Sequence, residues 1–431
     1  MKIQTTRIVT LILIIFATRL SAQSVVFSEI NYNSDSTVNS GNWVELYNTT
    51  NASIDITGWK IQNSLAASYT LPSGTNLSSH AYLVVAQDLV KFNSIHPGIS
   101  NLIGPSNLDL DNTTDHLQLL NAASAIQYEV TYFDTLPWPK GCDGWGRTLE
   151  NGNYAGTPND PSNWFDGCMF GSPGVAYTPC NPDIVFSEIN YNSAVLLDAG
   201  DWIELHNTTS APFNLNGWIL KDSKDSNQFI IPNVSIPANG YRVLAADLAK
   251  FLTRHPNVTN LNGPFNFAFK AKGEALRLVE PNGKTHFSVL YNNTAPWPTT
   301  PDSGGYTLEL LDEHGKMDDG NNWFAGCLEG SPGWPYAPDC NEGVNNVFGN
   351  EFSLTLLSNP ASDFISFQLV GLDPKNDYMI SILDLMGRQV ALRPAYNGNH
   401  LFSTRDLEPG IYFIRISSGN LSQSIKVIVQ K

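Results

Sequence analysis

Short segments in which apolar and polar residues alternate recur along the chain, and this period of two predicts β-strands. Turn residues separate them at intervals of roughly 10–20 residues, which favours antiparallel β-sandwiches. One or two helical turns are predicted after Asp88 and after Asp247, each Asp serving as N-cap. The predicted strands are residues 25–32, 42–48, 58–62, 81–86, 116–120, 127–132, 217–221, 240–245, 275–279 and 286–291.

The alternation also assigns side chains to faces. In the first strand it places Phe27 and Glu29 on the same face. In the second strand Val44 and Leu46 share one face, and Glu45 lies on the other. Glu29 and Glu45 therefore lie on the faces away from the Val and Leu side chains, which makes them candidates for cross-strand neighbours.

The pattern occurs twice. FSEINYNS at residue 27 returns at residue 186, and NWF.GC..GSPG at residue 163 returns at residue 322, at one constant offset of 159 residues. This period is too long for a solenoid repeat and matches the size of a whole domain. We therefore expect two copies of one domain, and residues kept in both copies serve the fold or a shared function.

The first 22 residues read as a secretory signal peptide. Lys2 and Arg7 precede an apolar run at residues 8–17, and small residues lead up to a predicted cleavage between Ala22 and Gln23. No other apolar run approaches 18 residues, so we expect no transmembrane segment in the mature chain.

Cysteines fit an exported protein. Two pairs sit in matching Gly- and Pro-rich loops, and each loop is short enough for a disulfide that contributes about 3 kcal/mol. Neither pair has further Cys or His ligands at metal-binding spacing. Cys142 has no counterpart and is either a free thiol or a competing partner of Cys168. The predicted disulfides are Cys168–Cys180 and Cys327–Cys340.

Charge narrows the list of partners. The formal net charge is −16, and no basic cluster offsets it, which argues against nucleic-acid binding. Charged residues make up only 15% of the chain, while Asn, Ser, Thr, Gly and Pro fill the gaps between apolar runs. This composition is typical of turn-rich extracellular β-proteins.

The order FSEI, WVEL or WIEL, a Gly-Trp strand, and YLVVA or YRVLA before a short helix resembles the lamin tail domain family. This resemblance covers most of each copy and implies an immunoglobulin-like β-sandwich. The family occurs in exported bacterial proteins and in nuclear lamins, and the resemblance gives the shared glutamates no catalytic role.

The C-terminal segment contains NPASD at residue 359, DLMGRQV at residue 384, LEPGIYFIRI at residue 407 and KVIVQK at the end. These motifs resemble the type A C-terminal sorting domain of the type IX secretion system of Bacteroidetes. That resemblance implies export by the type IX machinery, which would be a partner, and a secreted or outer-membrane-surface location.

Together the strand pattern and these resemblances imply an all-β chain of three immunoglobulin-like antiparallel β-sandwich domains in tandem. The predicted divisions are a signal peptide at 1–22, lamin-tail-like domains at 23–182 and 183–340, a linker at 341–351 and a sorting domain at 352–431.

Candidate catalytic groups are few. His96 and His255 recur, each before Pro and after the short helix, which favours a packed imidazole at a helix end. The sequence has no G-x-S-x-G or H-E-x-x-H motif. We therefore expect a protein that is not an enzyme.

Carboxylates offer two interpretations. In the pairs Glu29 with Glu45 and Glu188 with Glu204, either one carboxylate caps a loop amide and the other contacts solvent, or the pair forms a calcium site, since Ca²⁺ prefers oxygen ligands. A second calcium candidate lies in the first copy only, at Asp109, Asp111 and Asp115. No other cofactor is predicted.

Trp138 and Trp297 are the ligand-binding candidates. Both lie in Pro-Trp-Pro loops, where the ring either folds onto the sandwich, as large aromatic side chains usually do, or is exposed and can stack on a sugar or contact a partner. The main hypothesis is a secreted or cell-surface, non-enzymatic binding or adhesion protein with a glycan or protein ligand. The alternative is an accessory module, or a degenerate relative, of an exported hydrolase or nuclease.

Overall fold

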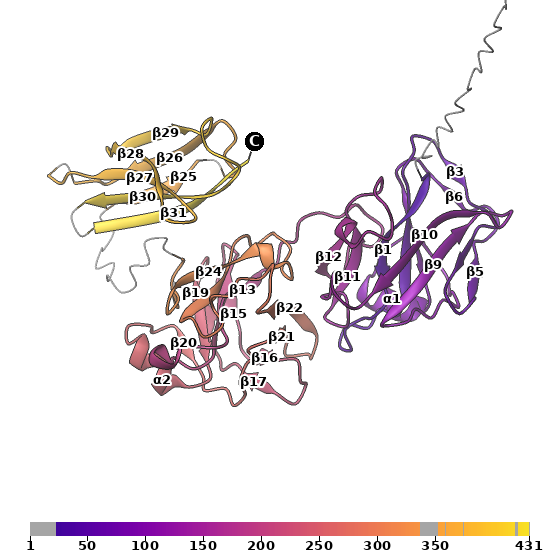
Figure 1. The fold of residues 1–431 in the computed structure, drawn as a ribbon, viewed down its shortest axis with the longest axis horizontal. Helices are drawn as coiled ribbons and strands as arrows, with labels where there is room; N and C mark the ends of the chain where they lie inside the picture. Colours follow the sequence, from indigo (N-terminus) through magenta and orange to yellow (C-terminus); the bar gives the residue numbers. More distant parts are fainter. Residues whose placement is uncertain (1–22, 337–351, 358, 374, 419–420, 431) are drawn as a thin grey trace, which may run out of the picture.

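The computed structural model describes residues 23–336, 352–357, 359–373, 375–418 and 421–430. The predicted signal peptide with Ala22, the linker and Cys340 lie outside the described residues. The described chain is almost entirely β-structure, as predicted, and forms three bodies in sequence order (Figure 1). No described helix has the length and apolar character needed to cross a membrane.

The first repeat is a sandwich of a six-stranded and a four-stranded sheet. The larger sheet has the order β12 (Trp164–Met169), β11 (Arg147–Asn151), β1 (Val25–Asn31), β2 (Trp43–Asn48), β7 (Tyr82–Ala86) and β8 (Leu102–Ile103). The smaller has the order β10 (Ile126–Phe133), β9 (Thr114–Leu120), β4 (Lys60–Gln62) and β5 (Ser68–Thr70). Outside these lie β3 (Ile54–Asp55), β6 (Asn76–Leu77), α1 (Leu89–Ile95) and the short helix η1 (Pro161–Asn163).

The second repeat has the same topology. Its larger sheet has the order β24 (Trp323–Leu328), β23 (Tyr306–Leu310), β13 (Ile184–Asn190), β14 (Trp202–Asn207), β19 (Tyr241–Ala245) and β20 (Leu261–Asn262). Its smaller sheet has the order β17 (Gln228–Ile230), β16 (Ile219–Lys221), β21 (Gly273–Val279) and β22 (Thr285–Asn292). The remaining elements are β15 (Phe213–Asn214), β18 (Ser235–Ile236), α2 (Leu248–Arg254), η2 (Val195–Leu197) and η3 (Gly320–Asn322).

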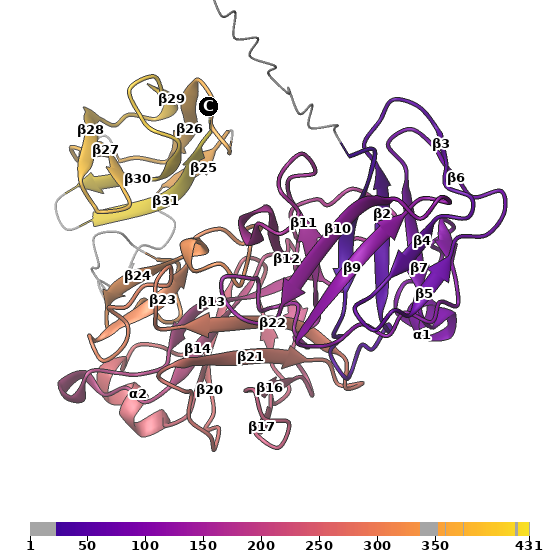
Figure 2. The ribbon, with the colours of Figure 1, turned by 45° about the vertical axis from the view of Figure 1, so that its right-hand side comes forward.

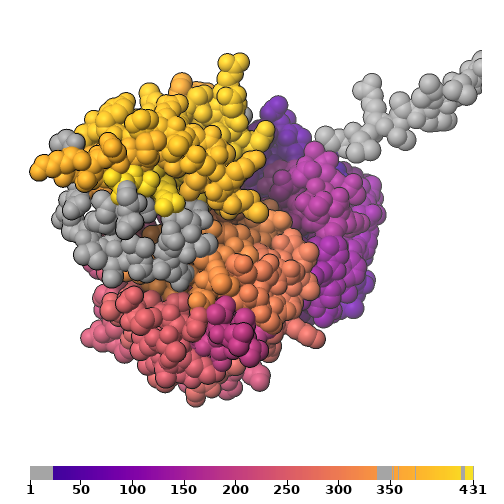
Figure 3. Space-filling view, turned by 60° about the vertical axis from the view of Figure 1, so that its left-hand side comes forward, coloured from indigo at the N-terminus to yellow at the C-terminus, as the bar shows by residue number. Residues whose placement is uncertain are grey.

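The C-terminal body packs a three-stranded sheet against a four-stranded sheet. Their strands are β25 (Ser353–Leu356), β26 (Phe364–Val370) and β29 (Gly398–Ser403), and β28 (Gln389–Pro394), β27 (Met379–Asp384), β30 (Gly410–Ser418) and β31 (Leu421–Val429). It lies against the second repeat, where Lys426 Nζ donates to the Leu311 carbonyl at 2.9 Å (Figure 3).

The predicted faces are wrong for Phe27, because strand β1 carries a β-bulge. Phe27 lies opposite Leu46 and Glu29 lies opposite Glu45, so Ser28 is an extra residue in β1. The bulge shifts the phase of the alternation. Phe27 therefore points into the core, where it packs edge-to-face on Tyr128 at 5.7 Å, while Glu29 points to the other side of the sheet. The second repeat has the same bulge between Phe186 and Glu188.

The short helices are confirmed with their caps. The Asp88 carboxylate accepts hydrogen bonds from the amides of Val90 and Lys91 at 2.9 and 3.0 Å, and Asp247 does the same for α2. These bonds satisfy amides that have no partner within the helix. The two aspartates therefore have a structural role.

The two repeats meet where β12 and the neighbouring loops of the first contact β22 of the second (Figure 2). The Ser288 hydroxyl donates to the Trp145 carbonyl at 2.6 Å. The Thr285 amide donates to the Thr37 hydroxyl at 2.8 Å. The first repeat is thus joined to the second by polar contacts to β22, the edge strand of the second repeat.

Candidate functional site

Three glutamates lie side by side on the larger sheet of the first repeat. Glu29 on β1 is the register partner of Glu45 on β2 and of Glu150 on β11. Their exposed fractions are 0%, 1% and 4%. The cross-strand pairing of Glu29 and Glu45 was predicted. The structure adds that both side chains are buried and that a third glutamate, Glu150 on β11, lies beside Glu29.

The segment Gly171–Gly174, which we call the GSPG segment, covers these glutamates. The Ser172 amide donates to Glu29 Oε1 at 3.0 Å, and the Gly174 amide donates to Glu45 Oε2. The Ser172 hydroxyl donates to Glu150 Oε1 at 2.7 Å. One loop is thus bound by all three carboxyl groups.

Hydroxyl groups of the sheet satisfy further oxygens. Thr148 donates to Glu29 Oε1 at 2.5 Å, and Ser28, the bulge residue, donates to Glu45 Oε1 at 2.7 Å. The bulge therefore has a second effect, since it turns the Ser28 hydroxyl toward the glutamates. Without a bulge the Ser28 side chain would lie on the opposite face from Glu29.

The second repeat builds the same network. Its glutamates are Glu188, Glu204 and Glu309, and its GSPG segment is residues 330–333. The matching donors are the Ser331 amide to Glu188 at 2.9 Å, the Gly333 amide to Glu204 at 2.5 Å, and the hydroxyls of Ser187, Thr307 and Ser331. Each donor and acceptor lies 159 residues after its counterpart, so the network belongs to the domain and not to one copy.

Burial changes the ionisation of these groups. It raises the pKa of Glu45 to about 8 and the pKa of Glu150 to about 7, because the charged form loses its hydration. The pKa of Glu29 is raised well above its usual value, first by burial and then by the charges of Glu150 and Glu45. Burial likewise raises the pKa values of Glu188 and Glu204. The cluster therefore retains protons at neutral pH.

This geometry supports loop attachment better than acid–base catalysis. A general acid or base must come within hydrogen-bond distance of its substrate. Here the glutamates are buried beneath the GSPG segment, and their oxygens accept bonds from that segment and from the sheet. Both glutamates of each predicted pair accept loop-amide bonds, whereas the sequence interpretation had one of them contacting solvent.

Glu150 and Glu309 were not among the residues predicted from the sequence. A signal was present: Thr-Leu-Glu at residues 148–150 returns at 307–309 with the same offset as the other repeated motifs. Spacing along the chain could not show that β11 pairs with β1, because the two strands are more than 100 residues apart.

Each GSPG segment leads into a turn that carries an exposed apolar side chain. The Val175 amide donates to the Ser172 carbonyl at 3.2 Å, and the Trp334 amide donates to the Ser331 carbonyl at 3.1 Å. Val175 is 59% exposed and Trp334 is 61% exposed, although both follow a segment bound to buried carboxylates. The network therefore fixes a turn that presents an apolar group at the same place in both repeats.

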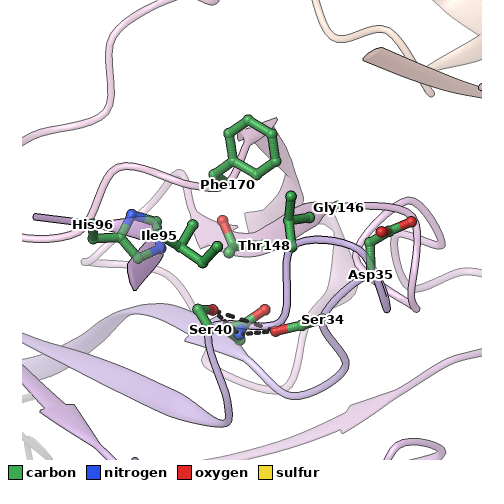
Figure 4. Close-up of a pocket in the computed structure, with 10 residues that line it drawn as sticks. Ser34, Asp35, Ser40, Ile95, His96, Gly146, Thr148 and Phe170 are labelled. Atoms are coloured by element: carbon green, nitrogen blue, oxygen red, sulfur yellow. Dashed lines mark hydrogen bonds between the residues drawn. The ribbon is translucent and has the colours of Figure 1, made fainter. Parts of the chain in front are cut away.

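Two cavities lie near these elements. A cavity of about 10 Å³ in the first repeat is lined by Ser34, Asp35, Ser40, His96, Thr148 and Phe170 (Figure 4), and its volume suits one water molecule. A larger cavity of about 270 Å³ lies between the second repeat and the C-terminal body, and its lining includes Tyr241, Glu313, Trp334, Tyr336, Phe413 and Lys426. Trp334 thus faces both a cavity and solvent.

The repeated histidines are packed at helix ends, as predicted. The His96 amide caps α1 by donating to the Phe92 carbonyl at 2.8 Å. Its imidazole lies 4.8 Å from the Phe92 ring and 5.9 Å from the Trp43 ring. Burial, with a contribution from the charge of Lys284, lowers the pKa of His96 to about 4, so the ring is neutral.

Trp138 and Trp297 adopt the buried arrangement, in which the loop folds onto the sandwich, and not the exposed one. They are only 4% and 7% exposed, because each ring folds back onto the core against another repeated tryptophan. Trp138 lies 6.2 Å from Trp164, and Trp297 lies 5.8 Å from Trp323. Burial of the large aromatic surface stabilises a conformation in which the loop folds onto the core.

The predicted aspartate site is spread over local turns. Asp111 accepts from the amide and hydroxyl of Thr113, and Asp115 accepts from the Ser64 amide at 2.9 Å. Asp109 accepts from the side chain of Gln87 at 3.1 Å. Within the described residues, no three His, Cys, Asp or Glu side chains are grouped so as to hold a metal ion. Calcium binding stays a prediction.

The disulfide Cys168–Cys180 is present, with Cα atoms 5.4 Å apart. Cys327 is also disulfide-bonded, and its predicted partner Cys340 lies outside the described residues. Cys142 is a buried free thiol whose sulfur lies 3.3 Å from the Tyr32 hydroxyl. It does not compete for Cys168.

The fold and the repeated network define tandem immunoglobulin-like modules followed by a separate β-sandwich. The model of the lamin tail domain matches residues 18–134 and 178–293, and the model of the secretion system C-terminal sorting domain matches residues 358–430. The chain belongs to the lamin tail domain family. Its sorting domain directs export by the type IX secretion system to the cell surface or the medium.

No curated protein matches the sequence. Solved structures with some likeness include the BSP domain of a biofilm associated protein, with 12% identity over 94% of this chain and 81% of that chain, and a TM-score of 0.18. PorZ of Porphyromonas gingivalis, a surface component of the type IX secretion system, has 11% identity over 94% of this chain and 45% of its own, and a TM-score of 0.17.

Proposed function

We propose that the exported chain is a non-enzymatic adhesion protein whose two GSPG segments contact an extracellular glycan or protein. The observation that carries this proposal is the repeated network itself. Three buried carboxyl groups in each repeat hold one GSPG segment, and the turn into which it leads presents Val175 or Trp334 to solvent. A rigid turn with an exposed apolar side chain binds with little loss of conformational entropy.

The duplication supports the same function. Two copies of a weak contact on one chain raise the overall affinity for a surface that carries many ligands. The sorting domain takes the chain to a place where such surfaces occur. Burial of the glutamates favours a binding function over a catalytic one, because a substrate cannot reach their oxygens without displacing the GSPG segment.

The test is a glycan array probed with the exported chain, with every bound glycan then assayed for turnover. We expect binding without turnover, and Trp334→Ala and Val175→Ser should each weaken it. Leu65→Ala is the matched control, since Leu65 is 78% exposed in another loop. An affinity-capture experiment on host and bacterial surface proteins covers a protein ligand.

Turnover of a bound glycan that disappears in Glu45→Gln would contradict the proposal. So would ligand binding that is unchanged when both Val175 and Trp334 are replaced, because the GSPG segments would then not be the contact surface.

A further inference from the structure

The contact between the two repeats uses two different surfaces. The first repeat contributes face A, which we define as residues 35–37, 145–147 and 169. The second repeat contributes face B, defined as residues 284–288 and 318. Because face A and face B differ, the contact is heterologous, and it leaves one copy of each face unused.

Face A covers the backbone of an edge strand. Strand β22 is at the edge of its sheet, so some of its amide and carbonyl groups have no neighbouring strand. The Thr37 hydroxyl accepts from the Thr285 amide at 2.8 Å, and Arg147 donates to the Ser288 carbonyl at 2.7 Å. Docking of face A thus protects this edge.

The repeat gives the chain a second copy of each face. Face A of the second repeat is residues 194–196, 304–306 and 328, and face B of the first repeat is residues 125–129 and 159. Residues 126–129 of this face lie on β10, which is again an edge strand. These unused faces hold apolar side chains in solvent, at exposed fractions of 92% for Val195, 89% for Leu196, 48% for Leu328 and 51% for Ile126.

The two unused faces complement each other in polarity. In the contact within the chain, the hydroxyls of Thr37 and Thr285 lie 3.0 Å apart. At the offset of the repeat, Thr37 corresponds to Leu196, and Thr285 corresponds to Ile126. A polar pair at the occupied contact therefore becomes an apolar pair at the unused one, and both members of that pair are exposed.

The charged pair changes in the same way. Arg147 pairs with Asp318 in the occupied contact, and these positions correspond to Tyr306 and Asn159. Both partners become neutral together, so these two positions bury no unpaired charge when the unused faces meet. Mismatched docking, with Arg147 against Asn159, would bury one. This difference keeps the two contacts distinct.

We propose that face A of the second repeat binds face B of the first repeat in a second copy of this chain. Copies then join head to tail by the arrangement that already joins the repeats within each chain. A heterologous contact that does not close a ring produces linear assemblies. The Leu196 and Ile126 side chains form the centre of the new contact.

Sedimentation velocity of the exported chain over a wide concentration range tests this proposal. We expect species larger than the monomer to appear as concentration rises. Leu196→Asp and Ile126→Asp should each weaken association by about tenfold or more, because each puts a charge into an apolar contact. The matched control is Leu65→Asp, which changes another exposed leucine and should leave association unchanged.

A mixing experiment makes the test specific to the two faces. Leu196→Asp retains the unused face B of the first repeat. Ile126→Asp retains the unused face A of the second repeat. An equimolar mixture should therefore form dimers and nothing larger, while each variant alone stays monomeric. Thermal melting of each variant checks that it is folded. A wild-type chain that stays monomeric, a mixture that stays monomeric, or variants that associate like wild type would each overturn the proposal.

Discussion

Arg147 of the first lamin tail domain and Asp318 of the second form an ion pair across the domain boundary. Nε and Oδ2 are 2.7 Å apart, and each side chain is only 2% exposed. Arg147 also donates to carbonyl groups on both sides, at Gly167 and Ser288. One buried guanidinium thus joins two domains that otherwise have separate cores.

Breaking this pair on one side should be costly. Asp318→Asn removes the carboxylate that contacts Arg147 Nε, while Asp166 stays near the guanidinium, and we expect a loss of about 1.5–3 kcal/mol in unfolding free energy. Adding Arg147→Tyr restores the neutral combination that the chain uses at Tyr306 and Asn159, and should recover part of the loss. Urea unfolding of both single variants and the double variant measures this coupling. Strictly additive losses would contradict the ion-pair account.

Stability should fall as pH rises, because of the buried glutamates. Their pKa values are raised in the folded state, so between the unfolded and folded pKa values the folded chain binds more protons than the unfolded one. The contribution of these protonated glutamates to the unfolding free energy is fully present below about pH 4.5. It is lost as pH rises through the folded pKa values, which are about 7 for Glu150 and about 8 for Glu45.

Glu45→Gln should flatten this dependence, since Gln cannot ionise. We expect wild type to lose at least about 1 kcal/mol more than the variant between pH 5 and pH 9, as one pKa unit corresponds to about 1.4 kcal/mol. Melting temperatures across that range provide the measurement. Glu129→Gln, a change at a half-exposed side chain, is the control. Parallel curves for wild type and Glu45→Gln would rule out the proposed ionisation.

Buried and exposed tryptophans should respond differently to truncation. Trp138→Ala removes a ring that is 4% exposed and should cost about 3–5 kcal/mol. Trp334→Ala removes a ring that is 61% exposed and should change stability by no more than about 0.5 kcal/mol. Denaturant unfolding separates the two. Equal effects would show that the packing of Trp138 is not as described.

The Cys168–Cys180 disulfide should stabilise the loop that contains the first GSPG segment. Cys168 and Cys180 are separated by 12 residues, and opening a loop of this size costs about 3 kcal/mol. We expect Cys168→Ser with Cys180→Ser to lower the melting temperature of the first repeat and to speed proteolysis between these positions. Proteolysis at wild-type rates would show that the carboxylate contacts alone hold the loop.

The sequence predicted those features that depend on local pattern and on the duplication. The strands, the Asp88 cap and the cross-strand approach of Glu29 to Glu45 follow from period-two alternation, capping chemistry and repetition. The predicted side of Phe27 was wrong because one bulge residue, Ser28, reverses the phase, and alternation alone does not reveal a bulge.

Features that depend on contacts distant in sequence were not predictable. Trp138 is buried because Trp164 offers it a partner 6.2 Å away, and a Pro-Trp-Pro motif carries no information about that partner. Glu150 joins the cluster through strand pairing with β1. Such pairings belong to the topology of the sheet, which short-range patterns do not encode.

Hydrogen exchange at the Gly174 amide tests most directly whether the carboxylates hold the GSPG segments. In Glu45→Ala the amide loses its acceptor, and we predict exchange at least about tenfold faster than in wild type. Glu45→Gln keeps an acceptor and should keep protection, while the Gly333 amide, bound to Glu204 in the other repeat, serves as an internal control. Unchanged protection of Gly174 in Glu45→Ala would contradict the account.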